Sequence, residues 1–176
     1  MIQATAVSLP PGIKADEVDI DKVKMEFSTR GYSGYTWYEI AKGDYDKGRF
    51  ILNLPLIVED KHLRPIVDGL SGGVQVSNVN AKFVSFETIG AYSTNRGSVG
   101  NLLYCKDNAR MEFWYVDSDV NITGSLSKEV DGDIRNGKFN LSLKRGWNKV
   151  YLKAGKSSNE YASKKLSGLT WHLFLF

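Results

Sequence analysis

Residues with the chemistry needed for catalysis are few in this sequence. The only histidines are His62 and His172, which lie far apart in dissimilar surroundings, and the only cysteine is Cys105. One cysteine forms neither an intrachain disulfide nor a cysteine-based zinc site. Nucleophile-elbow, phosphate-loop and metalloprotease motifs are missing from the sequence. We therefore expect a protein that is not an enzyme, with a two-carboxylate glycoside hydrolase as the catalytic alternative.

Pairs of aspartates are the first candidates for ligand binding. Asp44 and Asp46 form one pair, and Asp117 and Asp119 form another. Calcium prefers carboxylate and carbonyl oxygens, and two carboxylates at the end of a strand can converge on one ion. The alternative is that aspartate simply favours turns. If the pairs lie at the same end of a β-sandwich, they predict a calcium-dependent module of the C2 type, and no other cofactor is expected.

Aromatic residues are the second candidates for ligand binding. Tyr32, Tyr35 and Trp37 are close in sequence, and Trp147 lies in a predicted turn. Exposed aromatic side chains on a β-scaffold stack on sugar rings or anchor protein partners. The alternative is core packing, because strand alternation sends Tyr35 and Trp37 to one face and Tyr38 to the other. These four residues predict a surface that binds a glycan or a protein partner.

The segments that must position these residues have the pattern of β-strands. Residues 138–144 alternate strictly between apolar and polar side chains, which is typical of a half-buried antiparallel strand. Similar or strand-like patterns occupy residues 23–27, 35–40, 50–54, 81–89, 99–104, 111–115, 120–126, 149–154 and 169–176. Turn-forming Gly, Asn and Asp residues separate these segments. Residues 139–143 and 150–154 are expected to pair as a hairpin through the turn at 145–148.

These patterns predict an all-β protein with an antiparallel β-sandwich of about ten strands and a barrel-like variant as the alternative. Residues 58–63 and 158–165 are expected to form at most one or two short helices. A chain of 176 residues fits a single domain, residues 1–176. Residues 48–54 and 137–143 share the form Gly-basic-Phe-x-Leu-polar-Leu, so two small β-modules, residues 1–72 and 73–176, are the alternative.

Charge and hydropathy exclude several classes of partner. The 23 basic and 20 acidic residues give a net charge of +3 and are mixed along the chain, so nucleic acid is not an expected partner. No apolar run reaches the roughly 18 residues of a membrane-spanning helix. The first residues lack the basic and apolar regions of a signal peptide. Any membrane anchoring is expected only through a lipid that this sequence does not carry.

Two segments give the chain a family resemblance. Residues 146–151 read Gly-Trp-Asn-Lys-Val-Tyr, and residues 48–55 read Gly-Arg-Phe-Ile-Leu-Asn-Leu-Pro. In these motifs the sequence resembles uncharacterised secreted lipoproteins of Bacteroides-type bacteria. The resemblance implies a β-fold and a location in the cell envelope, in the periplasm or on the outer-membrane surface. It implies no catalytic residues.

The leading functional hypothesis combines these expectations. We expect a non-catalytic, envelope-associated β-sandwich module that binds a glycan or a protein partner. A calcium-dependent C2-like module and a glycoside hydrolase-type enzyme are the two alternatives.

Overall fold

The protein is built almost entirely of β-strands. The computed structural model describes the whole chain except residues 15, 16, 32, 33, 69, 71, 131 and 132. In this part of the chain there are sixteen strands and one 3-10 helix of three residues, Asp60–His62. No helix among these residues is long and apolar enough to cross a membrane. The all-β prediction is confirmed.

The strands form two compact units whose segments interleave along the chain. Unit 1 contains Met1–Leu56, Phe86–Cys105 and Thr170–Phe176, and unit 2 contains Ile57–Ser85 and Lys106–Leu169. A strand that crosses one of these boundaries belongs to the unit that holds most of its residues. The expected division at residue 72 does not coincide with any of these boundaries, and the question of one domain or two modules stays a prediction.

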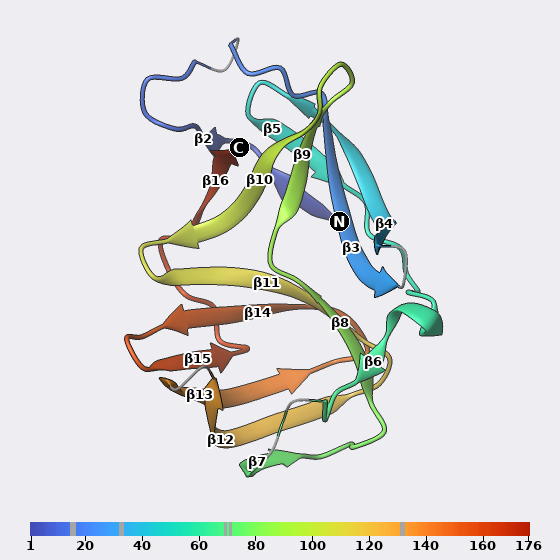
Figure 1. Ribbon diagram of the computed structural model, residues 1–176, viewed down its shortest axis with the longest axis vertical. Coiled ribbons are helices and arrows are strands. Elements are labelled where there is room, and N and C mark those ends of the chain that lie inside the picture. Colours follow the sequence, from blue (N-terminus) through green and yellow to red (C-terminus); the bar gives the residue numbers. More distant parts are fainter. Residues whose placement is uncertain (15–16, 32–33, 69, 71, 131–132) are drawn as a thin grey trace. The chain divides into compact units, whose positions relative to one another are not determined.

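Unit 1 is a ladder of neighbouring strands that stays open at both ends (Figure 1). Only the last pair, β16 with β2, is parallel, and the other described pairs are antiparallel. In order, the strands are β1 (Ile2–Ala4), β5 (Arg49–Leu52), β4 (Gly34–Asp46), β3 (Lys22–Gly31), β9 (Ile89–Ser93), β10 (Gly97–Lys106), β16 (Thr170–Leu175) and β2 (Val7–Ser8).

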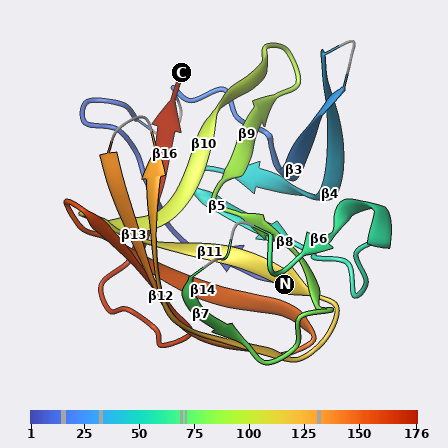
Figure 2. The same cartoon turned by 60° about the horizontal axis from the view of Figure 1, so that its bottom comes forward.

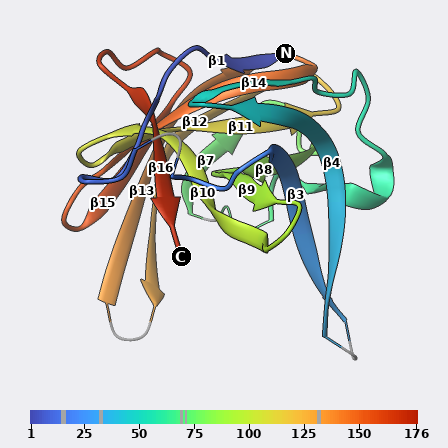
Figure 3. The same cartoon turned by 90° about the horizontal axis from the view of Figure 1, so that it is seen from above.

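The core of unit 1 follows from the alternation in its strands. On β3, Val23 and Met25 are fully buried, and on β5 the buried Phe50 and Leu52 flank an exposed Ile51. Trp171 on β16 packs edge-on against Phe50, with ring centroids 5.1 Å apart. Figure 3 shows β3 and β4 side by side as a long twisted hairpin.

Unit 2 is also an open ladder and contains one parallel pair, β15 with β13. In order, its strands are β6 (Arg64–Pro65), β8 (Lys82–Phe86), β11 (Ala109–Val116), β14 (Gly146–Ala154), β15 (Ser158–Ala162), β13 (Asp133–Leu143), β12 (Val120–Val130) and β7 (Gly73–Val76). Neither ladder closes on itself, so the described strands do not form the barrel-like variant.

One apolar cluster fills unit 2. It joins Phe83 of β8, Trp114 of β11, Val150 of β14, Leu141 of β13 and Ile122 of β12. Because β8 and β12 lie at opposite parts of the ladder, the sheet must curl so that one face surrounds this cluster (Figure 2). The curled sheet thus buries apolar side chains from strands that are not neighbours.

Two expectations about local structure were wrong. Residues 158–162 form β15 instead of a helix, and β15 lies between β13 and β14 and pairs with both. The predicted hairpin between residues 139–143 and 150–154 is therefore opened by a third strand. The alternation of Tyr161 and its neighbours was too short to distinguish a strand from a helix.

On β11, both faces are buried rather than one. Glu112 is buried and accepts hydrogen bonds from Trp114 Nε1 at 2.9 Å and from Arg110 Nε at 3.2 Å. A buried carboxylate is costly unless it is paired and hydrogen-bonded, and this one has both kinds of partner. In the sequence, Arg110 and Glu112 gave β11 the pattern of a strand with one exposed face, although both of its faces are buried.

Replacing Leu141 with alanine tests this core. Leu141 is 1% exposed within the apolar cluster, so Leu141→Ala should lower the free energy of unfolding by about 2–5 kcal/mol. Urea denaturation followed by tryptophan fluorescence measures the change. Ile134→Ala on the same strand is the control, because Ile134 is exposed and should cost about 0.5 kcal/mol or less. Equal losses for both variants would contradict the described core.

Candidate functional site

The structure describes two of the four predicted aromatic side chains, and they belong to different units. Trp37 on β4 of unit 1 is 65% exposed. Trp147 on β14 of unit 2 is half-buried and lies edge-on to Tyr115, with ring centroids 5.4 Å apart. Tyr32 and the side chain of Tyr35 lie outside the described residues. The predicted aromatic surface stays a prediction, and Trp37 is its one exposed member among the described side chains.

The predicted calcium ligands in unit 1 have basic partners. Asp44 Oδ1 lies 2.6 Å from Lys22 Nζ, and this contact lowers the pKa of Asp44 and raises the pKa of Lys22. Asp46 Oδ2 lies 3.6 Å from a guanidinium nitrogen of Arg49 across the turn between β4 and β5. In the structure, both carboxylates therefore take part in exposed ion pairs.

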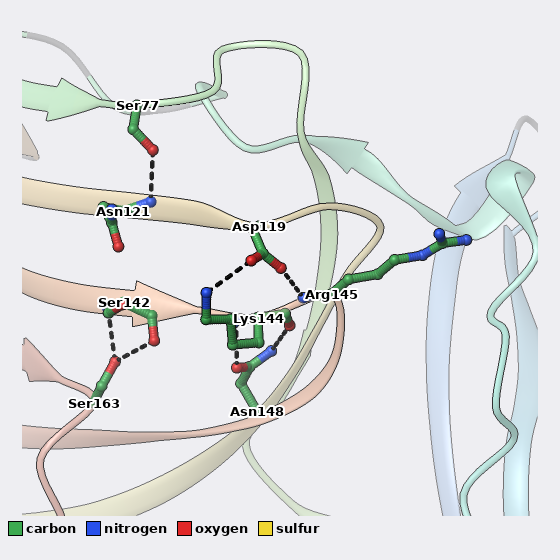
Figure 4. A network of polar contacts seen from close by, with 8 residues as sticks. All are labelled: Ser77, Asp119, Asn121, Ser142, Lys144, Arg145, Asn148 and Ser163. Carbon is green, nitrogen blue, oxygen red and sulfur yellow. Dashed lines mark hydrogen bonds and ion pairs between the residues drawn. The ribbon is translucent and has the colours of Figure 1, made fainter.

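The two predicted ligands in unit 2 hold turns together. Asp117 Oδ1 accepts hydrogen bonds from the Lys82 N–H at 2.9 Å and from the Ser118 hydroxyl at 2.8 Å. Asp119 accepts from Lys144 Nζ and from the Arg145 N–H, both at 2.8 Å (Figure 4). The contacts of Asp119 join the start of β12 to the turn between β13 and β14.

Asn148 closes the same turn from within. Its Oδ1 accepts the Lys144 N–H at 2.9 Å, and its Nδ2 donates to the Lys144 carbonyl oxygen at 2.7 Å (Figure 4). The same Nδ2 also donates to the Gly146 carbonyl oxygen at 2.9 Å. Among the residues that the structure describes, no three His, Cys, Asp or Glu side chains are grouped to hold a metal ion. Calcium binding by the four aspartates stays a prediction.

A polar cluster in unit 1 ties together β3, β4 and β9. The Tyr92 hydroxyl donates to Glu26, and Lys24 Nζ lies 3.2 Å from Glu39 and 4.9 Å from the centre of the Tyr92 ring. Burial and the hydrogen bond to Glu26 raise the pKa of Tyr92 to about 12. Because these side chains satisfy one another, the cluster is best explained as support for the three strands.

The outer edge of β16 in unit 1 is only partly covered by a neighbouring strand. Among the described strands, β16 pairs only with β10 on one side and β2 on the other. The parallel pairing with β2 covers Trp171 and His172 alone, opposite Val7 and Ser8. If that register continued, Pro10 would lie beside Phe174, but proline has no N–H to donate. The chain consequently leaves the sheet after β2, and a fork opens between β16 and the segment that follows β2.

Backbone groups of β16 face this fork. The Phe176 N–H donates to the Val99 carbonyl oxygen at 3.2 Å, and Leu175 lies opposite Gly100 in the register with β10. In an antiparallel pair, successive residues direct their backbone groups to alternate sides. The N–H and C=O of Leu175 therefore point away from β10, toward the edge that β2 has left.

Two adjoining cavities in unit 1 follow this edge. Cavity A, of about 440 Å³, lies in the fork and is lined by Ser8, Leu9, Pro10, Pro11, Ile13, His172, Leu173, Phe174 and Leu175. Cavity B, of about 340 Å³, is lined by Ile13, Glu17, Val18, Asp19, Arg96, Ser98, Val99, Leu175 and Phe176. Ile13 and Leu175 line both cavities, so the two adjoin at the end of β16.

Apolar side chains are exposed along the same edge. Phe174 is 50% exposed and Leu175 is 38% exposed, although both lie in a paired strand. On the opposite side of β16, Gly100 of β10 allows the two strands to approach closely, because a Cβ atom at this position would collide with the Phe174 carbonyl oxygen. The edge of β16 therefore combines backbone groups that point away from β10, exposed apolar side chains and cavities large enough for a ligand.

None of the predicted site residues whose side chains the structure describes lines these cavities. Two signals in the sequence pointed toward them: the Pro10-Pro11 pair after a very short strand, and the apolar run of residues 171–176. Neither signal identifies a binding edge alone, because the pairing of β16 with β2 joins segments from the two halves of the chain.

Titration of Tyr92 tests the polar cluster. Its pKa is raised from 10 to about 12, so the stability it contributes is complete below pH 10 and is lost as the pH rises toward 12. Comparing the alkaline absorbance titrations of the wild type and Tyr92→Phe should reveal one phenol that ionises near pH 12. Glu26→Gln should lower that value while leaving the phenol buried. A Tyr92 phenol that ionises near pH 10 would contradict the described contacts.

Acid titration tests the role of Asp119 in the turn. The contacts with Lys144 and with the Arg145 N–H hold its pKa below the usual 3.8. The stability it contributes is therefore present above pH 3.8 and is lost as the pH falls through the lower value. Asp119→Asn should destabilise the protein at neutral pH, and urea denaturation should show this difference shrinking in acid. Asp46→Asn, in an exposed ion pair, is the control and should change little.

Comparisons with known proteins identified no relative of this chain. No protein-family model, curated protein or solved structure matches the chain. The resemblance of residues 48–55 and 146–151 to envelope lipoproteins therefore stays a prediction, and the functional interpretation depends on the edge of β16 and its two cavities.

Proposed function

We propose that the protein is a non-catalytic binding module that captures an extended segment of a partner polypeptide at the edge of β16. The observation that supports this most directly is the fork between β2 and β16, where Leu175 directs its N–H and C=O away from β10. An extended peptide can add to such an edge as a further strand, because its own N–H and C=O groups complete the ladder.

The surroundings of this edge favour a peptide over a compact ligand. Unpaired edges of long, flat, apolar strands attract other chains, and proteins usually shield them. Here β2 shields Trp171 and His172 and leaves Leu173 to Leu175 facing cavity A. Leu9, Pro10 and Ile13 form apolar walls there, which suit a nonpolar side chain of the added strand.

A glycan is the second candidate ligand, and the exposed indole of Trp37 favours it. An exposed tryptophan on a strand can stack on a sugar ring. A single stacking residue gives little affinity, whereas the edge of β16 combines backbone groups with a hollow. We therefore place the partner polypeptide first. The predicted location in the cell envelope is compatible with either ligand.

A panel of synthetic peptides tests the proposed function. The probes are capped octapeptides in which valine alternates with threonine and one inner position carries lysine, glutamine or glutamate. Peptide binding should slow hydrogen exchange of the Leu175 amide by about tenfold or more in NMR spectra. The Phe176 amide already donates to Val99, so it should change much less.

Two variants of Leu175 separate backbone pairing from side-chain contact. Leu175→Pro removes the outward N–H and leaves the bonds to β10, so it should abolish peptide binding without unfolding the protein. Leu175→Ala keeps that N–H and should retain most of the binding. Thermal unfolding of both variants checks that the fold survives.

Three results would overturn the proposal. The first is that no peptide protects the Leu175 amide. The second is equal peptide binding by the proline and alanine variants. The third is protection that rises with protein concentration in the absence of peptide, since it would assign the edge to a second copy of this chain.

A further inference from the structure

The charges around cavity B are unequal. Among the residues of its lining that the structure describes, Glu17 and Asp19 are carboxylates and Arg96 is a guanidinium, so these side chains carry one net negative charge. These three side chains are not within ion-pair distance of one another in the described structure. The negative charge comes from the segment that follows Pro10-Pro11, and the positive charge comes from the turn between β9 and β10.

Existing hydrogen bonds use only part of the capacity of the two carboxylates. Glu17 Oε2 accepts the Lys14 N–H at 3.2 Å, and the Lys14 ammonium is 3.9 Å from Glu17 Oε1 in a well-exposed pair. Asp19 Oδ2 accepts the Ser93 hydroxyl at 2.7 Å. An ionised carboxylate offers about four acceptor sites, so both groups can accept further donors from a ligand.

The cavities also lie in a fixed order along the strand edge. Cavity A contacts His172 to Leu175, and cavity B begins at Leu175 and continues past Phe176 to Val99. Neighbouring residues of an added strand are about 3.3 Å apart along its axis. A strand bound in cavity A therefore brings a residue a few positions away into cavity B.

We infer that the captured segment carries a lysine or arginine side chain a few residues from an apolar side chain. The apolar side chain lies in cavity A against Leu9, Pro10 and Ile13. The basic side chain lies in cavity B, where Glu17 and Asp19 receive it and where Arg96 disfavours excess positive charge. This inference rests on the proposed function, and it adds the chemical class of the partner.

The same octapeptides test the inference. Peptides that carry lysine should bind about two- to fivefold more tightly than the glutamine peptides, and glutamate peptides should bind more weakly by a similar factor. Fluorescence polarisation at low and high salt measures the dissociation constants. The preference for lysine should decrease as salt screens the charges.

Substitutions in cavity B should change the preference for lysine in opposite directions, depending on the charge that is removed. Glu17→Gln and Asp19→Asn should each reduce the preference for lysine about two- to fivefold, since each removes one negative charge. Arg96→Gln should increase that preference, because it removes the opposing charge. Lys61→Gln is the control, since Lys61 belongs to unit 2 and should not change it.

The outcomes separate this inference from the function on which it rests. Equal binding of the lysine, glutamine and glutamate peptides, with protection of the Leu175 amide, overturns the inference and leaves strand capture in place. A preference for glutamate, or a lysine preference unchanged by Glu17→Gln and Asp19→Asn, also overturns it. Loss of all protection overturns both.

Discussion

Backbone hydrogen bonding between strands is the constraint on which this structure depends. Every strand directs N–H and C=O groups sideways, and each group needs a partner or water. With almost no helix, the chain satisfies them through two open ladders that combine segments from distant parts of the sequence. An open ladder always ends in an edge, so the treatment of its edges decides what else the molecule can contact.

At one edge of unit 1, proline limits the pairing. Pro10 and Pro11 prevent β2 from continuing beside β16, and the chain then contributes apolar and acidic residues to the walls of the resulting hollow. One local property of proline, the missing N–H, therefore shortens the protective strand and leaves a place where another strand can pair. The same segment supplies Glu17 and Asp19, which give the hollow its charge.

The parts of the fold that could be predicted are those governed by local alternation. The pattern at Phe50, Ile51 and Leu52 identified the buried face of β5, and Leu141 and Leu143 identified the core face of β13. Pairing partners could not be predicted, because contacts between distant segments leave no periodic signal. The insertion of β15 between β13 and β14 is the clearest example, since the intervening turn has all the features of a hairpin. The candidate edge of β16 was missed for the same reason.

The interleaving of the two units has a consequence for biosynthesis. All the residues of unit 2 that follow β10 precede β16, the strand that covers one side of β10 in unit 1. On the ribosome, β10 must therefore wait while residues 106–169 are made, and unit 2 can assemble during that interval. Until β16 emerges, the nascent chain carries a strand edge with which neighbouring chains can pair. Completion of unit 1 is thus a late event whose timing depends on the speed of translation.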